Sequence, residues 1–304
     1  MTIFDCRLRI INRQSQIANH KSKIINRKSE IANLKMLTSL VIRLQSAEDA
    51  GLTFGNGRAV HGLWFSLWQQ VDPELATRLH TQNGAPPFTL SPLMGLPRPR
   101  QGHISVRKDR PTWFRITTLT EELSTAVKEN WLPALPEEIE LAGVRWRVTG
   151  YTDDPAEHPW AGRARYSQLA NQRLFGKEQP KSWRLRFETP AAFHGSAGHL
   201  PFPLPDSLVK SWLRRWNAFA PIALPDDLSD RTRSGVVVSA YNLKTVPVRH
   251  GKRLIVGCTG WEKLYTVNLH PAMRAALNLL AHYAFYCGSG AKTTQGMGMT
   301  RIED

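Results

Sequence analysis

Hydrophobic and polar residues alternate from 40 to 44, and this period of two predicts a strand. From 58 to 70 the apolar positions recur instead at helical spacing, which predicts an amphipathic helix. Asp72 before Pro73 supplies an N-cap and a first helical residue, so we expect a short second helix that runs through Leu79. The chain therefore opens with a strand followed by two helices.

The same pattern continues through the first half of the chain. Strand-like runs appear at 102–107 and 112–118, a helical run follows at 120–131, and a further strand is expected at 139–149. The resulting order is strand, helix, strand, strand, helix, strand. That order is the ferredoxin-like unit.

A segment rich in Pro, Asp and Gly at 151–163 reads as a connector. A second round begins with a strand at 183–189 and a helix from Asp206, read as its N-cap, to about Phe219. One face of this helix is apolar, and its basic residues are expected to point outward: Lys210, Arg214 and Arg215.

Strands at 234–241 and about 252–268, a helix from Pro271 to Phe285 and a terminal strand complete the second round. The fold class is thus α+β, with two tandem ferredoxin-like domains. We place the first domain at 36–156 and the second at 157–304.

Residues 1–35 stand apart as a basic tail. The heptads INRQSQI, ANHKSKI and INRKSEI follow one another, and eight basic against two acidic residues give this segment six of the 15 net positive charges. One interpretation of the tail is a basic helix or an RNA-binding arm. We favour a disordered segment or a translated DNA repeat ahead of a start at Met36, because a strand-like run follows Met36 at once and the repeats hold no aromatic residue.

The net charge of +15 and the pI near 10 indicate an anionic partner, for which nucleic acid is favoured over a membrane surface. The longest apolar stretch, 275–286, is too short to span a bilayer. Three cysteines without CxxC spacing argue against a zinc site or a disulfide framework and favour the cytoplasm.

A glycine-rich segment, CGSGAKTTQGMGMT, follows the last helix. It matches neither the P-loop nor the dinucleotide fingerprint. Glycines can bring backbone amides close to a phosphate, and Lys292 adds a charge, but a helix cap followed by a turn explains the glycines equally well. The candidate phosphate contacts are Gly288, Gly290, Lys292, Gly296 and Gly298.

Three stretches in a fixed order carry a resemblance to a known family: LATRLHTQNGAPPFTLSPL at 75–93, LRFETPAAFHG at 185–195 and GSGAKTTQGMGM at 288–299. Over about 36–304 the chain resembles the RAMP superfamily of CRISPR-associated proteins, and within it the endoribonucleases of the sixth Cas family. The resemblance implies a metal-independent enzyme without a cofactor. It would cut CRISPR repeat RNA in precursor transcripts by attack of a 2′-OH, leaving 2′,3′-cyclic phosphate and 5′-OH ends.

The resemblance places the family's catalytic histidine on His80, while the ordinary role of a histidine near a helix C-terminus is to interact with the helix dipole. Members with an added tyrosine and lysine would carry them at Phe65 and Pro87, neither of which transfers protons. His61, about one turn before Phe65, is the nearest second candidate, with a half-buried helix histidine as the alternative. Lys108, Arg163 and Arg165 could supply positive charge or could be ordinary surface residues.

The expected partners are CRISPR repeat RNA and other CRISPR effector subunits, with no membrane, and the chain is expected to be a monomer or homodimer. The main alternative is an inactive or weakly active scaffold of the same fold that holds the repeat, a reading that the Phe65 and Pro87 departures favour. A third alternative, a general basic RNA-binding protein, predicts no preference for the repeat.

Overall fold

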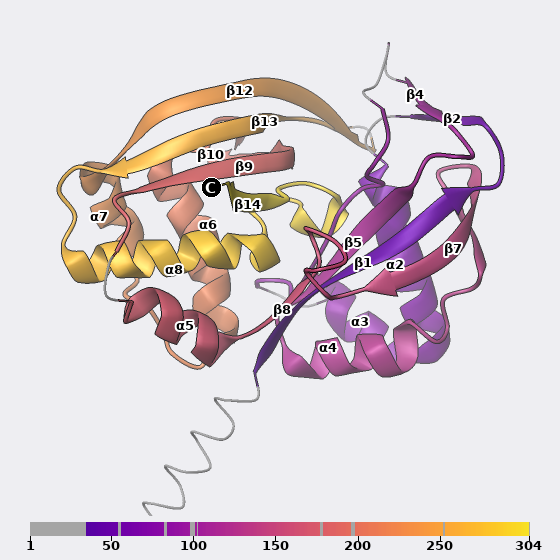
Figure 1. Cartoon of the computed structure of the whole chain (residues 1–304), viewed down its shortest axis with the longest axis horizontal. Coiled ribbons are helices and arrows are strands. Elements are labelled where there is room, and N and C mark those ends of the chain that lie inside the picture. Colours follow the sequence, from indigo (N-terminus) through magenta and orange to yellow (C-terminus); the bar gives the residue numbers. More distant parts are fainter. Residues whose placement is uncertain are drawn as a thin grey trace, which may run out of the picture.

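The computed structural model describes residues 35–303 except for 54–55, 82–83, 98–100, 102, 177–178, 196–197 and 252. The basic heptads lie outside the described residues, so the interpretation of the tail remains a prediction. Figure 1 shows two halves side by side, each built from a curled sheet with helices packed on one face. Within the described residues, none of the helices combines the length and the apolarity that crossing a membrane requires.

The C-terminal half has the predicted ferredoxin-like order. Its antiparallel sheet runs β12-β13-β9-β14, so the first and third strands of the motif lie at the centre. The elements are β9 (Ser182–Ala191), α6 (Pro205–Phe219), α7 (Leu228–Gly235), β12 (Val236–His250), β13 (Arg253–Thr266), α8 (Pro271–Cys287) and β14 (Thr300–Glu303). The long alternating strands and the amphipathic helices made this half readable from the sequence.

The N-terminal half follows the same plan with additions. Its sheet runs β3-β5-β1-β7-β6, and β8 pairs with the end of β1 that β7 leaves open. The elements are β1 (Met36–Ser46), α2 (Gly57–Val71), α3 (Pro73–Thr81), β3 (Phe88–Leu90), β5 (Thr112–Thr118), α4 (Glu121–Ala126), η1 (Val127–Trp131), β6 (Glu138–Leu141), β7 (Val144–Thr152) and β8 (Gly162–Arg165). The two-domain ferredoxin-like prediction is confirmed.

One strand of the N-terminal half was assigned to the wrong place. The run at 102–107 forms β4 (His103–Val106), which pairs with β2 (Ala50–Thr53) as a separate ribbon. The strand that pairs with β5 in the ferredoxin-like sheet is the three-residue β3. It follows two prolines and is too short to show any alternation, so the pattern gave no sign of it.

Smaller differences follow from turns that the pattern passed over. The strand expected at 139–149 is the hairpin β6–β7, which turns at Ala142 and Gly143, both at positive φ. The connector 151–163 runs into β8, and α5 (Tyr166–Leu174) follows without having been predicted. Two short strands, β10 (Phe193–Gly195) and β11 (Gly198–Leu200), form another hairpin after β9.

Helix starts were predicted with mixed success. Asp72 caps α3 as expected, because its Oδ1 accepts from the Leu75 amide at 2.9 Å. Asp206 does not cap α6: it lies in the first turn, after Pro205, and its carboxylate accepts instead from Arg233. Arg215 does not point outward either, since it is buried against the glycine-rich loop.

The two halves meet on a buried arginine. Arg115 of β5 donates to the Phe285 carbonyl of α8 at 3.0 Å, and its guanidinium lies about 5 Å from the ring centroids of both Trp160 and Phe285. Those two rings stack on each other 5.7 Å apart. Burial lowers the pKa of Arg115 to about 9, which leaves it charged at neutral pH. Thr117, two residues along β5, donates to the Tyr286 carbonyl at 2.7 Å.

The buried side chain of Glu262 should make the stability of the fold depend on pH. Its side chain is fully buried in β13, neither carboxylate oxygen has a hydrogen-bond partner among the described residues, and burial raises its pKa to about 9. Above about pH 4.5 the unfolded chain releases this proton, whereas the folded chain retains it up to about pH 9. The free energy of unfolding should therefore fall with rising pH across this window.

We expect Glu262→Gln to remove this fall, which amounts to at most about 1.4 kcal/mol per pH unit. Urea unfolding at pH 6, 7 and 8 measures it, with the exposed Glu138→Gln as the matched control. Equal pH slopes for the wild type and Glu262→Gln would show that Glu262 is ionised in the folded state.

Candidate functional site

His61 and His80 lie on either side of one phenylalanine. His61 and Phe65 are one turn apart on α2, with ring centroids 4.9 Å apart and the rings edge to face. The ring of His80, near the end of α3, meets the same Phe65 ring at 5.5 Å, again edge to face. The structure thus brings the two histidines predicted from the sequence into one cluster.

The short helix α3 presents His80 to solvent. Asp72 and Pro73 fix where the helix starts, and its apolar residues Leu75 and Leu79 turn towards the core. His80 then falls on the outer face and is exposed. Pro87, at the position where the resemblance placed a lysine of some members, is buried beside β3, so this chain offers no proton-transfer group there.

The hydrogen bond of His61 fixes its tautomer. Its Nδ1 lies 2.9 Å from the Thr294 carbonyl oxygen, which can only accept, so Nδ1 carries the proton. In the neutral ring, Nε2 then holds a free electron pair. Burial lowers the pKa of His61, and the charges of His80, Arg58 and Lys292 lower it further against the opposing effect of the Thr294 bond. A neutral imidazole with an open Nε2 is what a general base requires.

Thr294 belongs to the glycine-rich segment, which we call the glycine loop (288–298). Most of its amides already donate to acceptors within the protein, and only three of these hydrogen bonds end on acceptors in the loop itself, the carbonyls of Lys292 and Gly298. The donors are the amides of Gly288, Ser289, Gly290, Ala291, Gln295, Met297 and Gly298. The amides of Gly288, Gly290 and Gly298 are therefore not available to a phosphate in this conformation.

The glycines allow the loop to pack closely. Gly290 and Gly298 both have positive φ, and a Cβ on either would overlap a backbone carbonyl oxygen, that of Ala192 or Ser289. Gly296 also has positive φ, and its Cβ would lie 2.8 Å from the Cα of Gly57 at the start of α2. The contacts of Gly290 and Gly296 hold the loop against the end of β9 and the start of α2.

Side chains of helix α6 hold the glycine loop in place through hydrogen bonds. Arg215 donates to Thr293 Oγ1 at 2.7 Å, and the Trp212 indole donates to Ser289 Oγ at 2.9 Å. Ser211 Oγ accepts from the Gly290 amide at 2.9 Å. Arg215, which was expected on the surface, thus helps to position the loop.

Lys292 is the exposed charge of the glycine loop. It adopts the left-handed conformation, at φ 56°, and its side chain is in solvent while Ala291 and Thr293 on either side are buried. Its charge contributes to lowering the pKa of both His61 and His199. Lys292 is therefore close enough to act electrostatically on both the histidine cluster and the β10–β11 hairpin.

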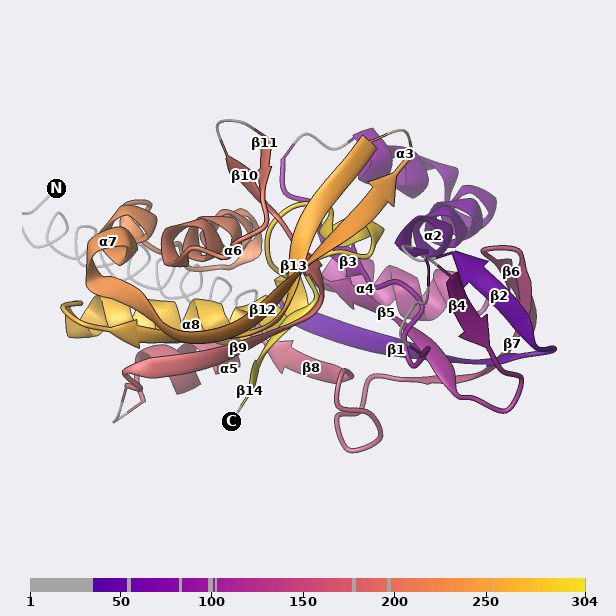
Figure 2. The same ribbon diagram turned by 90° about the horizontal axis from the view of Figure 1, so that it is seen from above.

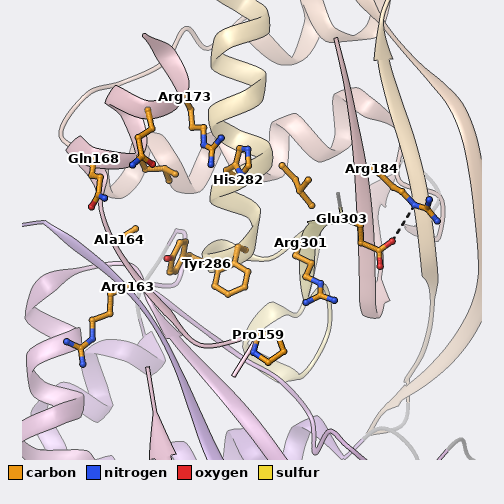
Figure 3. A pocket seen from close by; sticks show the side chains of 14 residues that line it. Pro159, Arg163, Ala164, Gln168, Arg173, Arg184, His282, Tyr286, Arg301 and Glu303 are labelled. Carbon is orange, nitrogen blue, oxygen red and sulfur yellow. Dashed lines mark ion pairs between the residues drawn. The ribbon is translucent and has the colours of Figure 1, made fainter. Parts of the chain in front are cut away.

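Arg163, one of the candidate cations named from the sequence, lies away from this cluster. Arg163 makes a bidentate ion pair with Asp153, and it lines a cavity of about 900 Å³ together with Arg173, Arg184 and Arg301 (Figure 3). Figure 2 shows that α5, β8 and β14, which form this cavity, lie on the opposite side of the molecule from α3. Arg163 is thus not a partner of His80. Among the described residues, no group of three or more His, Cys, Asp or Glu side chains is placed to hold a metal ion.

The fold and this loop define a class of protein, the tandem ferredoxin-like RAMP fold. A family model for the CRISPR Cas6 N-terminal domain matches residues 36–171, and one for the CRISPR-associated endoribonuclease Cas6 matches residues 185–300. The two models together span most of the chain. The chain belongs to the Cas6 family.

Individual relatives agree with this assignment. The CRISPR-associated endoribonuclease Cas6 of Mycobacterium tuberculosis is 24% identical over 191 residues, which are 62% of this chain and 58% of that protein. The chain thus spans little more than half the length of this curated relative. A product complex of Cas6 (TTHB231) from Thermus thermophilus is 27% identical with a TM-score of 0.71, and one of Cas6 (TTHA0078) is 28% identical with a TM-score of 0.70. Each comparison covers 88% of this chain and 100% of the other.

The close packing of the glycine loop predicts that replacing one of its glycines by alanine destabilises the fold. Gly290→Ala should lower the free energy of unfolding by roughly 1–3 kcal/mol, because the Cβ overlaps the Ala192 carbonyl and φ is positive. The control is Gly62→Ala on the exposed face of α2, where a Cβ meets nothing, and it should be neutral or stabilising by up to about 1 kcal/mol. Chemical denaturation measures both, and an unchanged Gly290→Ala would mean that the loop packs loosely.

Proposed function

We propose that the protein is an endoribonuclease that binds CRISPR repeat RNA in precursor transcripts and cuts it without a metal ion. The observation that carries this proposal is the His61–Phe65–His80 cluster beside Lys292, in which the hydrogen bond to Thr294 prepares one histidine to accept a proton. The family membership and the RNA product complexes among the structural relatives support it.

In the proposed reaction His61 acts as the base. Its Nε2 takes the proton of a ribose 2′-OH, and the 2′-oxygen attacks the adjacent phosphorus. As the O2′–P bond forms, the bond from phosphorus to the 5′-oxygen breaks, and protonated His80 donates a proton to the leaving oxygen. The products are a 2′,3′-cyclic phosphate and a 5′-OH.

The surroundings of the two histidines suit these different roles. His61 is half buried, and its pKa is lowered, so it is neutral at the pH where a base is needed. His80 is exposed on the outer face of α3, where a bulky RNA strand can reach it. Lys292 can balance the charge that develops on the phosphate, in the manner of electrostatic stabilisation of a transition state.

The glycine loop serves this proposal as a scaffold as well as an RNA contact. It supplies the Thr294 carbonyl to His61 and presents Lys292 to the phosphate backbone. Gly288, Gly290, Gly296 and Gly298 contribute to RNA binding chiefly by giving the loop its shape.

One observation favours a second candidate function. The resemblance assigns proton-transfer groups of some family members to the positions of Phe65 and Pro87, and neither of these side chains can transfer a proton. A repeat-binding scaffold subunit of a CRISPR effector complex, with little or no cleavage activity, would tolerate both. The cleavage assay below separates the two candidates.

We expect His80→Ala and His61→Ala each to slow single-turnover cleavage of repeat RNA by about 10² to 10⁴, because each removes one proton transfer. Cleavage by the wild-type protein should persist in EDTA, and mapping of the product ends should show a cyclic phosphate and a 5′-OH. His103→Ala, an exposed histidine on β4, is the control.

RNA affinity should change little in the two variants. A wild type that binds the repeat tightly without cutting it would favour the scaffold, and equal affinity for unrelated RNA would favour a general RNA-binding protein. Unchanged cleavage in His61→Ala would remove His61 from the mechanism.

The pH profile tests the role of His61 separately. Since the pKa of His61 lies below 6.5, the cleavage rate should rise with pH along a limb whose apparent pKa is also below 6.5. His61→Ala should lose this limb, whereas His103→Ala should keep it. An ascending limb centred above pH 7 would contradict the assignment of His61 as the base.

A further inference from the structure

A pair of histidines faces solvent beside the glycine loop and has no part in the proposed chemistry. His194 of β10 and His199 of β11 are directly opposite each other in the register of the hairpin. Their ring centroids lie 5.2 Å apart, and both side chains are exposed. Figure 2 shows this hairpin projecting from the same side of the molecule as α3.

The pair is held in a fixed relation to the glycine loop. Phe193, next to His194, is buried in the C-terminal core, and the Ala192 carbonyl accepts from the Ala291 amide at 2.8 Å. Gly290 packs so closely on Ala192 that no side chain fits between them. The base of the hairpin and the loop therefore form one rigid unit, with Lys292 exposed on the same unit.

The charges around the pair are of one sign. Partial burial lowers the pKa of His199, and the charges of His194 and Lys292 lower it further. The elements that pack against the hairpin are α6 and β13. The charged side chains of these two elements are basic or neutralised: Lys210, Arg214, Arg253 and Lys263 are exposed, Arg215 is buried against the glycine loop, Asp206 is paired with Arg233, and Glu262 is buried.

Two imidazoles about 5 Å apart repel each other once both are protonated, unless an anion lies between them. The two nonbridging oxygens of a phosphodiester can accept one N–H from each ring. Resting on the proposed function, we propose that His194 and His199 together bind a backbone phosphate of the RNA in their protonated form. This contact lies on the same unit as Lys292 and adds affinity as the pH falls.

The test compares His194→Asn/His199→Asn with the wild type on repeat RNA that carries a single 2′-deoxy residue at the cut site and so cannot be cleaved. At pH 5.5 the double variant should bind roughly three- to tenfold more weakly, and at pH 8 less than twofold more weakly. At pH 5.5 its plot of log affinity against log salt should be shallower by roughly 0.7 for the one lost phosphate contact. His103→Asn is the control and should match the wild type at both pH values.

Further comparisons keep the outcomes distinct. Equal losses at the two pH values, or no loss at either, would overturn the proposal. Each single variant should lose part of the effect, which guards against a folding defect confined to the double variant. If the wild type shows no preference for the repeat, the proposed function fails, and the same pH comparison on a uridylate 12-mer still decides whether the pair binds phosphate.

Discussion

The candidate site depends on a close approach of backbones that only glycine permits. The glycine loop passes within contact of the start of α2, the end of β9 and the middle of α6, and a Cβ at 290, 296 or 298 would collide with another backbone. From this position the loop directs one carbonyl at His61 and one lysine into solvent. The arrangement of the two histidines and of the nearby charge follows from that packing.

Much of the fold could be predicted from the sequence, and the elements that were missed or misplaced have physical reasons. The C-terminal half was predicted because its strands and helices are long enough to show their periods. In the N-terminal half β3 has three residues and follows two prolines, so a longer run, β4, was assigned to the sheet in its place. Helix α5 was missed because few of its residues turn towards the core.

The site was predicted in part. His80 and His61 were named from a motif and a helical spacing, but only the structure places Phe65 between them and gives His61 its partner in Thr294. The loop glycines were expected to expose amides, and most of the loop amides are instead already bonded. Arg215 was expected to point outward, and no rule of composition indicates that a basic side chain will turn inward to a threonine.

The hydrogen bond of His61 also crosses from one half of the chain to the other. His61 belongs to α2, whereas the carbonyl that sets its tautomer lies more than two hundred residues later, beyond the last helix. Neither half alone holds a prepared base, so a chain divided between the two halves would recover the site only when its fragments reassociate. The buried contacts of Arg115 keep the halves together. Whether Nε2 of His61 is ready to accept a proton therefore depends on the docking of the two domains.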